Sequence, residues 1–319
     1  MQLHGRPSVG QAIAQQGGVV LDGSAPLEIP FSTSPEELQG QSYSSVICTV
    51  KTFAVESALQ ELKASGAAFG ELVSFQNGWG SEQFYTDIFP DHHLWTLTTT
   101  RAIGVEAPGV LFQADKGGLA VAPWDPEKTT HSSPVALRRL PIPLVQPSNG
   151  VDQKWSKLLL NVMGNATGAV TGLAPRDFAD HAKLMRLELL LVREAMAVGR
   201  ALGVERVDLP GFPIRLLSGM IEKLPLAVIA PIVAKKMKTA RGDKLPSLFE
   251  DLKNPNAPSE VEAMNGAVVE VGRQVGIATP YQTLLMEVFH RCRQEPSFWE
   301  RLRNKPERLA DLLNPKAKR

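Results

Sequence analysis

Residues 46–75, VICTVKTFAVESALQELKASGAAFGELVSF, decide the fold class of this chain. Val46 to Val50 is a continuous run rich in β-branched residues, typical of a strand that is buried on both faces of a sheet. Ala54 to Ala64 has the apolar spacing of a helix, and Glu71 to Phe75 is a second short strand-like run. Strand, helix and strand in this order predict a parallel sheet joined by right-handed crossovers.

The segments on either side of this stretch extend the α/β pattern. Val19 to Leu21 and Leu27 to Phe31 are short apolar runs bounded by Gly, Asp and Pro, as strands are. Ser34 to Leu38 has a proline and two acidic residues where a helix would begin. Leu94 to Ala122 is strand-rich and is expected to close one edge of the sheet.

The pattern changes in the second half of the chain. Leu140 to Gly150 carries three prolines and a glycine, which suits a linker. Helical spacing of apolar residues then dominates at Trp155–Val170, Phe178–Leu202, Leu216–Thr239, Ser259–Val275 and Tyr281–Cys292. We therefore predict an α/β domain over residues 1–150 and an all-α domain over residues 151–319.

The bulk composition excludes several classes of protein. The chain has 319 residues, of which 43% are hydrophobic and 21% charged, and its formal net charge is +1. No global field would attract nucleic acid or an acidic membrane, and we expect neither as a partner. Two distant cysteines, Cys48 and Cys292, are typical of a reduced, cytoplasmic protein. The adjacent His92 and His93 have no third ligand at a suitable spacing, so no metal site is expected.

Lys157, Asn161 and Asn165 are the most informative candidates for a site. Their spacing of four residues places them on one face of the predicted helix, among apolar neighbours. Each buried polar group left unpaired costs about 1–3 kcal/mol, so these side chains need partners. Two interpretations stay open: a local network with backbone carbonyls, or the polar wall of a ligand site.

Other candidates follow predicted strands or precede predicted helices. Lys51 follows the first strand and Asn77 the second, and ligands of open parallel sheets bind beyond the carboxyl ends of strands. Ser259 with Glu262 fits a helix capping box, and Glu260 in the first turn could serve only as a partner of the helix dipole.

In this order, these segments resemble the ketopantoate reductase (2-dehydropantoate 2-reductase) family from about Leu3 to the end of the helical half. Val46 to Lys51 resembles the family's strand that ends in a lysine near the cofactor. Gln76-Asn77-Gly78 resembles its turn, whose asparagine lies between cofactor and substrate. Trp155 to Asn165 is similar to its Trp-x-Lys-Leu helix, where the lysine is the general acid and the asparagines help to hold the substrate.

Two later segments carry the same resemblance. Ser247 with Asp251 is similar to a Ser-Met-x-x-Asp segment whose serine contacts the substrate carboxylate. Glu260 with Asn265 and Gly266 resembles a helix start whose glutamate binds near the nicotinamide ribose. The resemblance implies a Rossmann-like NADP-binding domain followed by a helical domain like the C-terminal domain of 6-phosphogluconate dehydrogenase.

The resemblance also implies an activity, which is NADPH-dependent reduction of a 2-keto acid, with ketopantoate to pantoate as the expected reaction. Negative charge builds on the carbonyl oxygen as hydride arrives, and an ammonium group such as that of Lys157 can stabilise it and donate the proton. The implied roles are catalytic for Lys157 and Glu260, substrate-binding for Asn77, Asn161, Asn165 and Ser247, and cofactor-binding for Arg6, Lys51, Asn77 and Glu260.

The chain departs from the family at its beginning. Members start with a strand, a Gly-x-Gly-x-x-Gly turn and a helix, but here Met1 to Arg6 resembles the end of the second strand, with Arg6 near the 2′-phosphate position. The truncated unit should expose a sheet edge and weaken cofactor binding. A misplaced start or a diverged protein would each explain this. The alternative function is therefore a non-catalytic member of the fold that binds a small carboxylate or a partner chain. The many apolar residues of the helical half also point to a homodimer.

Overall fold

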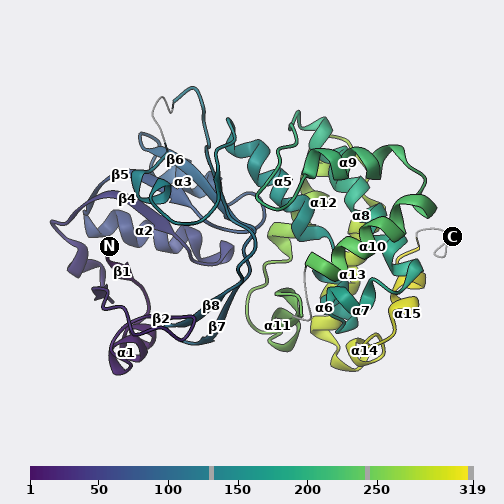
Figure 1. The fold of residues 1–319 in the computed structure, drawn as a ribbon, viewed down its shortest axis with the longest axis horizontal. Coiled ribbons are helices and arrows are strands. Elements are labelled where there is room, and N and C mark those ends of the chain that lie inside the picture. Colours follow the sequence, from purple (N-terminus) through teal and green to yellow (C-terminus); the bar gives the residue numbers. More distant parts are fainter. Residues whose placement is uncertain (129–132, 241–244, 315–319) are drawn as a thin grey trace.

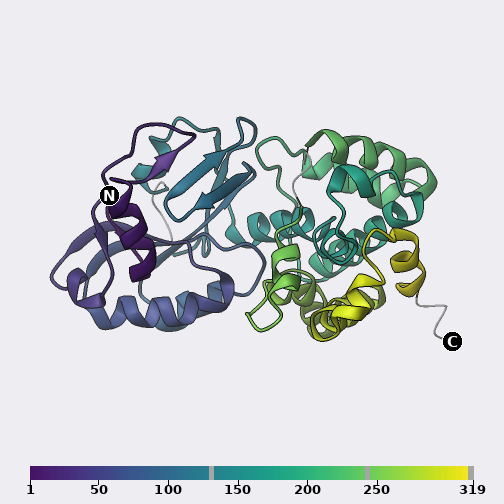
Figure 2. The ribbon, with the colours of Figure 1, turned by 90° about the horizontal axis from the view of Figure 1, so that it is seen from below.

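The computed structural model describes residues 1–128, 133–240 and 245–314, and the chain forms two lobes (Figure 1, Figure 2). An α/β lobe with the N-terminus lies at the left of Figure 1 and a helical lobe with the C-terminus at the right. This arrangement confirms the predicted fold class. The predicted boundary at residue 150 stays a prediction; helix α5 begins there, at the junction of the lobes.

A five-stranded sheet forms the centre of the α/β lobe, in the order β10-β9-β6-β5-β4. Strands β4, β5 and β6 are parallel, with Val46 paired to Leu72 and Leu72 to Leu94, whereas β9 is antiparallel to β6. The carboxyl ends of β4 and β5 therefore meet at one edge of the sheet. The bounds of the sheet strands and of the helices between them are β4 Ser42–Cys48, η2 Thr52–Ala54, α2 Val55–Ser65, β5 Ala68–Ser74, α3 Glu82–Ile88, β6 His93–Thr99, β9 Leu119–Pro123, α4 Val135–Arg138 and β10 Leu144–Val145.

The N-terminal strands pair outside this sheet. Strand β1 (Leu3–His4) pairs with β3 (Phe31–Ser32), and β2 (Val20–Leu21) joins the hairpin of β7 (Ile103–Ala107) and β8 (Val110–Gln113). Helix α1 is Pro7–Gln15, and η1 is Pro35–Leu38. In the described residues, β4 thus has a sheet neighbour on one side only.

Four expectations for this lobe need correction. The segment Leu94 to Ala122 does not close an edge of the sheet, because β6 and β9 lie inside it and the edge strands are β4 and β10. Strand β4 is not buried on both faces: it is an edge strand, and the side chain of Ile47 is 38% exposed. Of the strand expected over Leu27 to Phe31, only Phe31 is in a strand, while Leu27 forms an isolated bridge to Val19. The helix expected at Ser34 is a single 3₁₀ turn, capped by the Ser34 side chain.

Helix α8 is the centre of the helical lobe and contacts α5, α10, α12, α13 and α15. Its buried residues include Leu184, Leu189, Leu191 and Val198. No helix among the described residues is long and apolar enough to cross a membrane. The bounds of the lobe's helices are α5 Gly150–Val162, α6 Ala166–Thr171, α7 Pro175–Phe178, α8 Ala182–Ala201, α9 Ile214–Lys223, α10 Leu226–Ala240, α11 Leu248–Lys253, η3 Glu262–Gly266, α12 Ala267–Gln274, α13 Pro280–Gln294, α14 Pro296–Glu300 and α15 Pro306–Leu312.

Two of the long predicted helices are interrupted. The helix predicted over Trp155 to Val170 ends at Val162, because Gly164 adopts a left-handed conformation with φ of +73° before α6 begins. The helix predicted over Leu216 to Thr239 is divided into α9 and α10 next to Pro225, where Leu224 is extended. A proline disfavours the helical conformation of the residue before it, which explains this break.

Candidate functional site

Two turns at the carboxyl ends of β4 and β5 form the sheet side of the candidate site. The Gln76 side chain ties them together, since its Nε2 donates to the carbonyl oxygens of Cys48 and Val50 at 2.8 and 3.0 Å. Thr52 Oγ1 donates to the carbonyl of Asn77 at 3.1 Å. Lys51 and Asn77, which follow these strands, are therefore held on neighbouring turns.

The turn after β5 also contacts the helical lobe. The backbone N–H of Trp79 donates to the carbonyl of Ala263 at 2.8 Å. Gly78 has φ of +85°, and a Cβ placed on it would lie 2.3 Å from that same carbonyl oxygen. Only glycine fits both the conformation and the close approach, which fixes Asn77 beside the helices.

Helix α5 carries Lys157 and Asn161, and Asn161 contacts this turn. Asn161 Nδ2 lies 3.4 Å from Asn77 Oδ1, which joins the two lobes through their amides. Lys157 is half-buried and stands one helical turn before Asn161 on the same face. Among the site residues predicted from the sequence, Asn77 and Asn161 are thus directly in contact.

Asn165 is not on the same helix as Lys157, contrary to the prediction, because α5 has ended and Asn165 is the N-cap residue of α6. It still contacts another candidate, since Asn165 Nδ2 lies 3.4 Å from Ser247 Oγ. The backbone N–H of Leu248 donates to Asn165 Oδ1 at 3.3 Å. The break therefore moves Asn165 off α5 and leaves it at the start of α11.

Lys51 is paired with two carboxylates of the helical lobe. Its Nζ lies 3.2 Å from Glu260 Oε2 and 3.6 Å from Asp251 Oδ1. The Lys51 side chain is 52% exposed, whereas that of Glu260 is 11% exposed. Asp251 Oδ2 accepts hydrogen bonds from Ser259 Oγ at 2.7 Å and from the Glu260 backbone N–H at 3.0 Å. An acidic pair thus faces the cation at the end of β4.

These contacts correct the expectations for Ser259 and its neighbours. Ser259 does not form a capping box with Glu262, because its hydroxyl donates to Asp251 and Glu262 Oε1 lies 3.1 Å from His290 Nε2. Glu260 is not in a first helical turn, because η3 begins at Glu262, and its carboxylate pairs with Lys51 instead. Ser259 Oγ still accepts locally from the Val261 backbone N–H at 3.2 Å, but Glu262 takes no part in that cap.

A π-helical turn, η3, follows Glu260. The backbone N–H of Gly266 donates to Val261 O, five residues earlier, at 3.0 Å. Buried Asn265 donates from Nδ2 to Gln282 Oε1 at 2.9 Å. Turns of this type occur often at functional sites. The turn lets Glu260 face Lys51 while Asn265 bonds within the helical core.

Sequence reasoning missed one polar network beneath the site. Lys154 and Glu82 form an ion pair at 2.9 Å, with side chains 1% and 0% exposed. Lys154 Nζ also donates to the carbonyl of Gln76 at 2.6 Å, directly before Asn77. Lys154 directly precedes Trp155, where the predicted helix begins, whereas α5 begins at Gly150 and carries Lys154 into the core, where a lysine needs a partner. This network anchors the Asn77 turn from below.

Arg6 lies apart from the other candidates. It is the N-cap residue of α1 and its side chain is exposed. In the described part of the chain, neither a hydrogen bond nor an ion pair joins it to Lys51, Asn77 or Glu260. The remaining candidates supply two amines, three amides, a hydroxyl and one carboxylate, with contacts between Asn77 and Asn161, between Asn165 and Ser247, and between Lys51 and Glu260. Such a cluster can bind a small polar molecule and transfer a proton to it.

Comparisons with known proteins agree on one family. The model described as Ketopantoate reductase PanE/ApbA matches residues 2–126, and that described as its C terminal matches residues 150–293. A 2-dehydropantoate 2-reductase of Streptococcus pyogenes serotype M18 is 24% identical over 282 residues, covering 88% of this chain and 85% of that protein. The one from Caulobacter vibrioides is 27% identical over 259 residues, covering 81% of this chain and 80% of that protein.

Solved structures show the same fold. A PanE/ApbA family ketopantoate reductase from Ralstonia eutropha has a TM-score of 0.72 at 21% identity, covering 91% of this chain and 89% of that one. A ternary structure of D-mandelate dehydrogenase with NADH and anilino(oxo)acetate also has a TM-score of 0.72, at 18% identity, covering 93% of this chain and 91% of that one. At such identities the likeness concerns the fold alone.

Proposed function

Since the chain belongs to the ketopantoate reductase family, a family of oxidoreductases, we propose that it reduces a 2-keto acid, with ketopantoate to pantoate as the reaction. The observation that carries the proposal is the contact of Asn161 of α5 with Asn77 at the carboxyl end of β5, with Lys157 one helical turn before Asn161. A carbonyl compound between these groups would meet an ammonium and two amides.

Lys157 is the proposed general acid. As the keto carbon is reduced, charge collects on the carbonyl oxygen, and a positioned ammonium both stabilises that charge and supplies the proton. Asn161, Asn165 and Ser247 are the proposed partners of the substrate carboxylate and hydroxyl. Asn165 and Ser247 already lie 3.4 Å apart, so one carboxylate could accept hydrogen bonds from both.

The sheet edge suits the nicotinamide end of a dinucleotide cofactor. Lys51, Asn77 and Glu260 would hold that end, since ligands of such sheets bind beyond the strands' carboxyl ends. The cofactor supplies the hydride when bound. Arg6 is the proposed partner of a 2′-phosphate, which favours NADPH over NADH. Glu260 keeps a catalytic role in this proposal, because its carboxylate sets the position of Lys51.

Residues 1–319 contain no Gly-x-Gly-x-x-Gly turn, the motif whose backbone N–H groups hold the pyrophosphate of a dinucleotide. For these residues we expect weak NADPH binding in a fluorescence titration. An Arg6→Gln variant should lower the preference for NADPH over NADH. An affinity in the micromolar range or tighter would contradict the first expectation, and an unchanged preference would remove Arg6 from the site.

The activity is tested with a panel of 2-keto acids at NADPH concentrations high enough to offset weak binding. Lys157→Ala should lower turnover by about 10²–10⁴-fold, the usual contribution of a general acid. Lys116→Ala, which removes an exposed lysine of the α/β lobe, is the control and should leave turnover unchanged. Wild-type turnover in Lys157→Ala would exclude Lys157 as the acid.

Calorimetric titration with ketopantoate separates the proposal from its alternative. If the chain binds the keto acid through Lys157 but turns over no member of the panel, the non-catalytic, carboxylate-binding function is correct instead. Homodimer formation and a cytoplasmic location also stay predictions. Sedimentation analysis tests the first, and the two buried thiols, Cys48 and Cys292, suit the reducing compartment that the second requires.

A further inference from the structure

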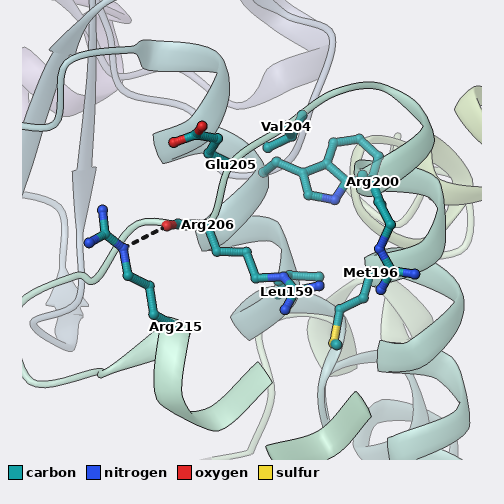
Figure 3. A pocket seen from close by; sticks show the side chains of 9 residues that line it. Leu159, Met196, Arg200, Val204, Glu205, Arg206 and Arg215 are labelled. Atoms are coloured by element: carbon teal, nitrogen blue, oxygen red, sulfur yellow. Dashed lines mark hydrogen bonds between the residues drawn. The ribbon is translucent and has the colours of Figure 1, made fainter. Parts of the chain in front are cut away.

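A hollow with a volume of about 460 Å³ lies within the helical lobe, apart from the candidate site (Figure 3). Helix α5 contributes Trp155 and Leu159 to its wall, and the remaining lining residues come from α8, α9 and the segment between them. None of the proposed catalytic or substrate-binding residues lines it. The hollow is therefore distinct from the candidate site at the sheet edge.

The lining combines an apolar surface with a basic rim. The apolar part of the lining consists of Trp155, Leu159, Met196 and Val204. Figure 3 shows Arg200, Arg206 and Arg215 placed around the hollow from three different segments. Sites for small molecules usually have this composition, in which apolar walls bind the body of the ligand and a few polar groups orient it.

The charges at the rim leave one guanidinium without a carboxylate partner. Arg200 and Arg206 both pair with Glu222, so one carboxylate serves two cations. Arg215 Nε donates to the carbonyl of Arg206 at 2.9 Å, and within the described ranges no acidic side chain forms an ion pair with Arg215. Asp208 Oδ1 accepts from the backbone N–H of Arg215 at 2.9 Å, so the exposed Arg215 guanidinium is the rim cation that a ligand carboxylate can reach.

The hollow is connected to the catalytic helix by direct hydrogen bonds. Asp152 Oδ1 accepts from the backbone N–H of Glu205 at 2.9 Å, and Ser156 Oγ accepts from that of Val207 at 2.9 Å. Both acceptors are on α5, and Ser156 directly precedes Lys157. A ligand that moves the segment carrying Glu205 and Arg206 therefore acts on α5 itself.

Trp155 provides a second connection, toward the Asn77 turn. Its indole packs against Gly199, where an added Cβ would lie 2.2 Å from Nε1, and Nε1 donates to Ala195 O at 3.0 Å. On its other side the ring meets Trp79 edge to face, with centroids 5.0 Å apart and planes at 84°. Trp79 is two residues after Asn77, so one aromatic ring separates the hollow from the turn.

We propose that this hollow is a second binding site for a small monocarboxylate with an aromatic or branched aliphatic body. The carboxylate binds Arg215, and the body packs on Trp155 and Leu159. Occupancy acts through α5 and Trp79 on the groups that hold the substrate. The effect on catalysis rests on the proposed function, whereas the binding itself does not.

Benzoate is the probe, and the indole N–H signals of the five tryptophans in a ¹⁵N-labelled sample are the readout. We expect a saturable shift of the Trp155 signal, assigned with Trp155→Phe, and a smaller shift of Trp79. Benzamide, which has the same shape without the charge, should bind about tenfold more weakly, as should benzoate to Arg215→Gln, because a hydrogen bond between charged groups is lost. Arg215 is exposed, and a melting curve verifies that this variant stays folded.

Lys157→Met distinguishes this site from the catalytic one. If the proposal holds, benzoate binds Lys157→Met with unchanged affinity, and saturating benzoate changes the KM of the wild type but not of Arg215→Gln. Loss of binding in Lys157→Met with retention in Arg215→Gln would place benzoate at the catalytic cluster and overturn the proposal. The proposal is also overturned if the shifts do not saturate and benzamide reproduces them. It is overturned as well if inorganic phosphate binds more tightly than benzoate. If the chain shows no turnover, the binding measurements alone decide.

Discussion

Replacing Lys154 with methionine tests the network that supports the Asn77 turn. Lys154→Met keeps the volume and shape of the buried stem, but it leaves the carboxylate of Glu82 buried without its cation. Ser74 Oγ and Ser81 Oγ would still donate to Glu82 Oε1 at 3.0 and 3.2 Å. Glu82 Oε2 accepts no hydrogen bond within the described ranges, so nothing replaces the lysine.

The expected loss follows from the burial of both groups. Breaking a buried ion pair by removing one partner costs about 3–5 kcal/mol, a large part of the roughly 5–15 kcal/mol that stabilises a folded protein. At a urea slope of about 3 kcal/mol/M, this loss lowers the unfolding midpoint by roughly 1 M or more. Far-ultraviolet circular dichroism and tryptophan fluorescence should report the same shift if unfolding is a single transition.

The matched control is the double variant Lys154→Met/Glu82→Gln, in which both charges are absent. It should recover most of the lost stability, since a neutral amide buried beside Ser74 and Ser81 carries a far smaller desolvation cost. The reasoning fails if the single variant loses less than about 1 kcal/mol, or if the double variant is as unstable as the single one. Loss of the bond to Gln76 O should also raise the KM for the keto acid in both variants.

Two further predictions concern other positions. Gly78→Ala should destabilise the chain by about 1–3 kcal/mol and raise the KM for the keto acid. The control is Gly80→Ala, because Gly80 has a positive φ but open space around it and should show only the smaller backbone cost in the same urea titration. Equal losses of stability in the two variants would exclude the contact with Ala263 as the cause. Burial raises the pKa of Glu194 to about 7 from its ordinary 4.5, although its carboxylate accepts from two backbone N–H groups of α13, including that of Tyr281. The folded state then holds this proton more tightly than the unfolded state, so the group's contribution to stability falls as pH rises from about 4.5 to about 7. Urea titrations of Glu194→Gln and the wild type across this range should give a difference, variant minus wild type, that grows with pH, and a constant difference would contradict the raised pKa.

The α/β half of the fold could be predicted from the sequence, because the spacing of apolar residues differs between strands and helices. The run from Val46 to Phe75 predicted strand, helix and parallel strand, and the structure has β4, α2 and β5 there. The burial of β4 could not be predicted, because a central strand and an edge strand can have the same apolar sequence. Only the pairing of distant strands decides which it is.

The candidate site could be predicted only in part, because contacts between distant elements leave no pattern in the sequence. The sequence brought Asn77 and Asn161 to attention, and the structure places their amides 3.4 Å apart. It gave no hint that Asn165 leaves the helix, since Gly164 within an apolar pattern is compatible with a continuous helix. Lys154 was missed because its partner, Glu82, lies far along the chain, and ion pairs between distant elements leave no spacing signal.

The π-helical turn at Glu262–Gly266 has a consequence for how this chain tolerates insertion and deletion. A π turn holds one residue more than an α turn, so removing one residue from it would restore regular α geometry and leave the residues on either side close to their present positions. Glu260 would stay opposite Lys51, and the helix after the turn would keep its packing. In a regular helix such as α13 the same deletion would rotate one side of the helix by about 100° relative to the other.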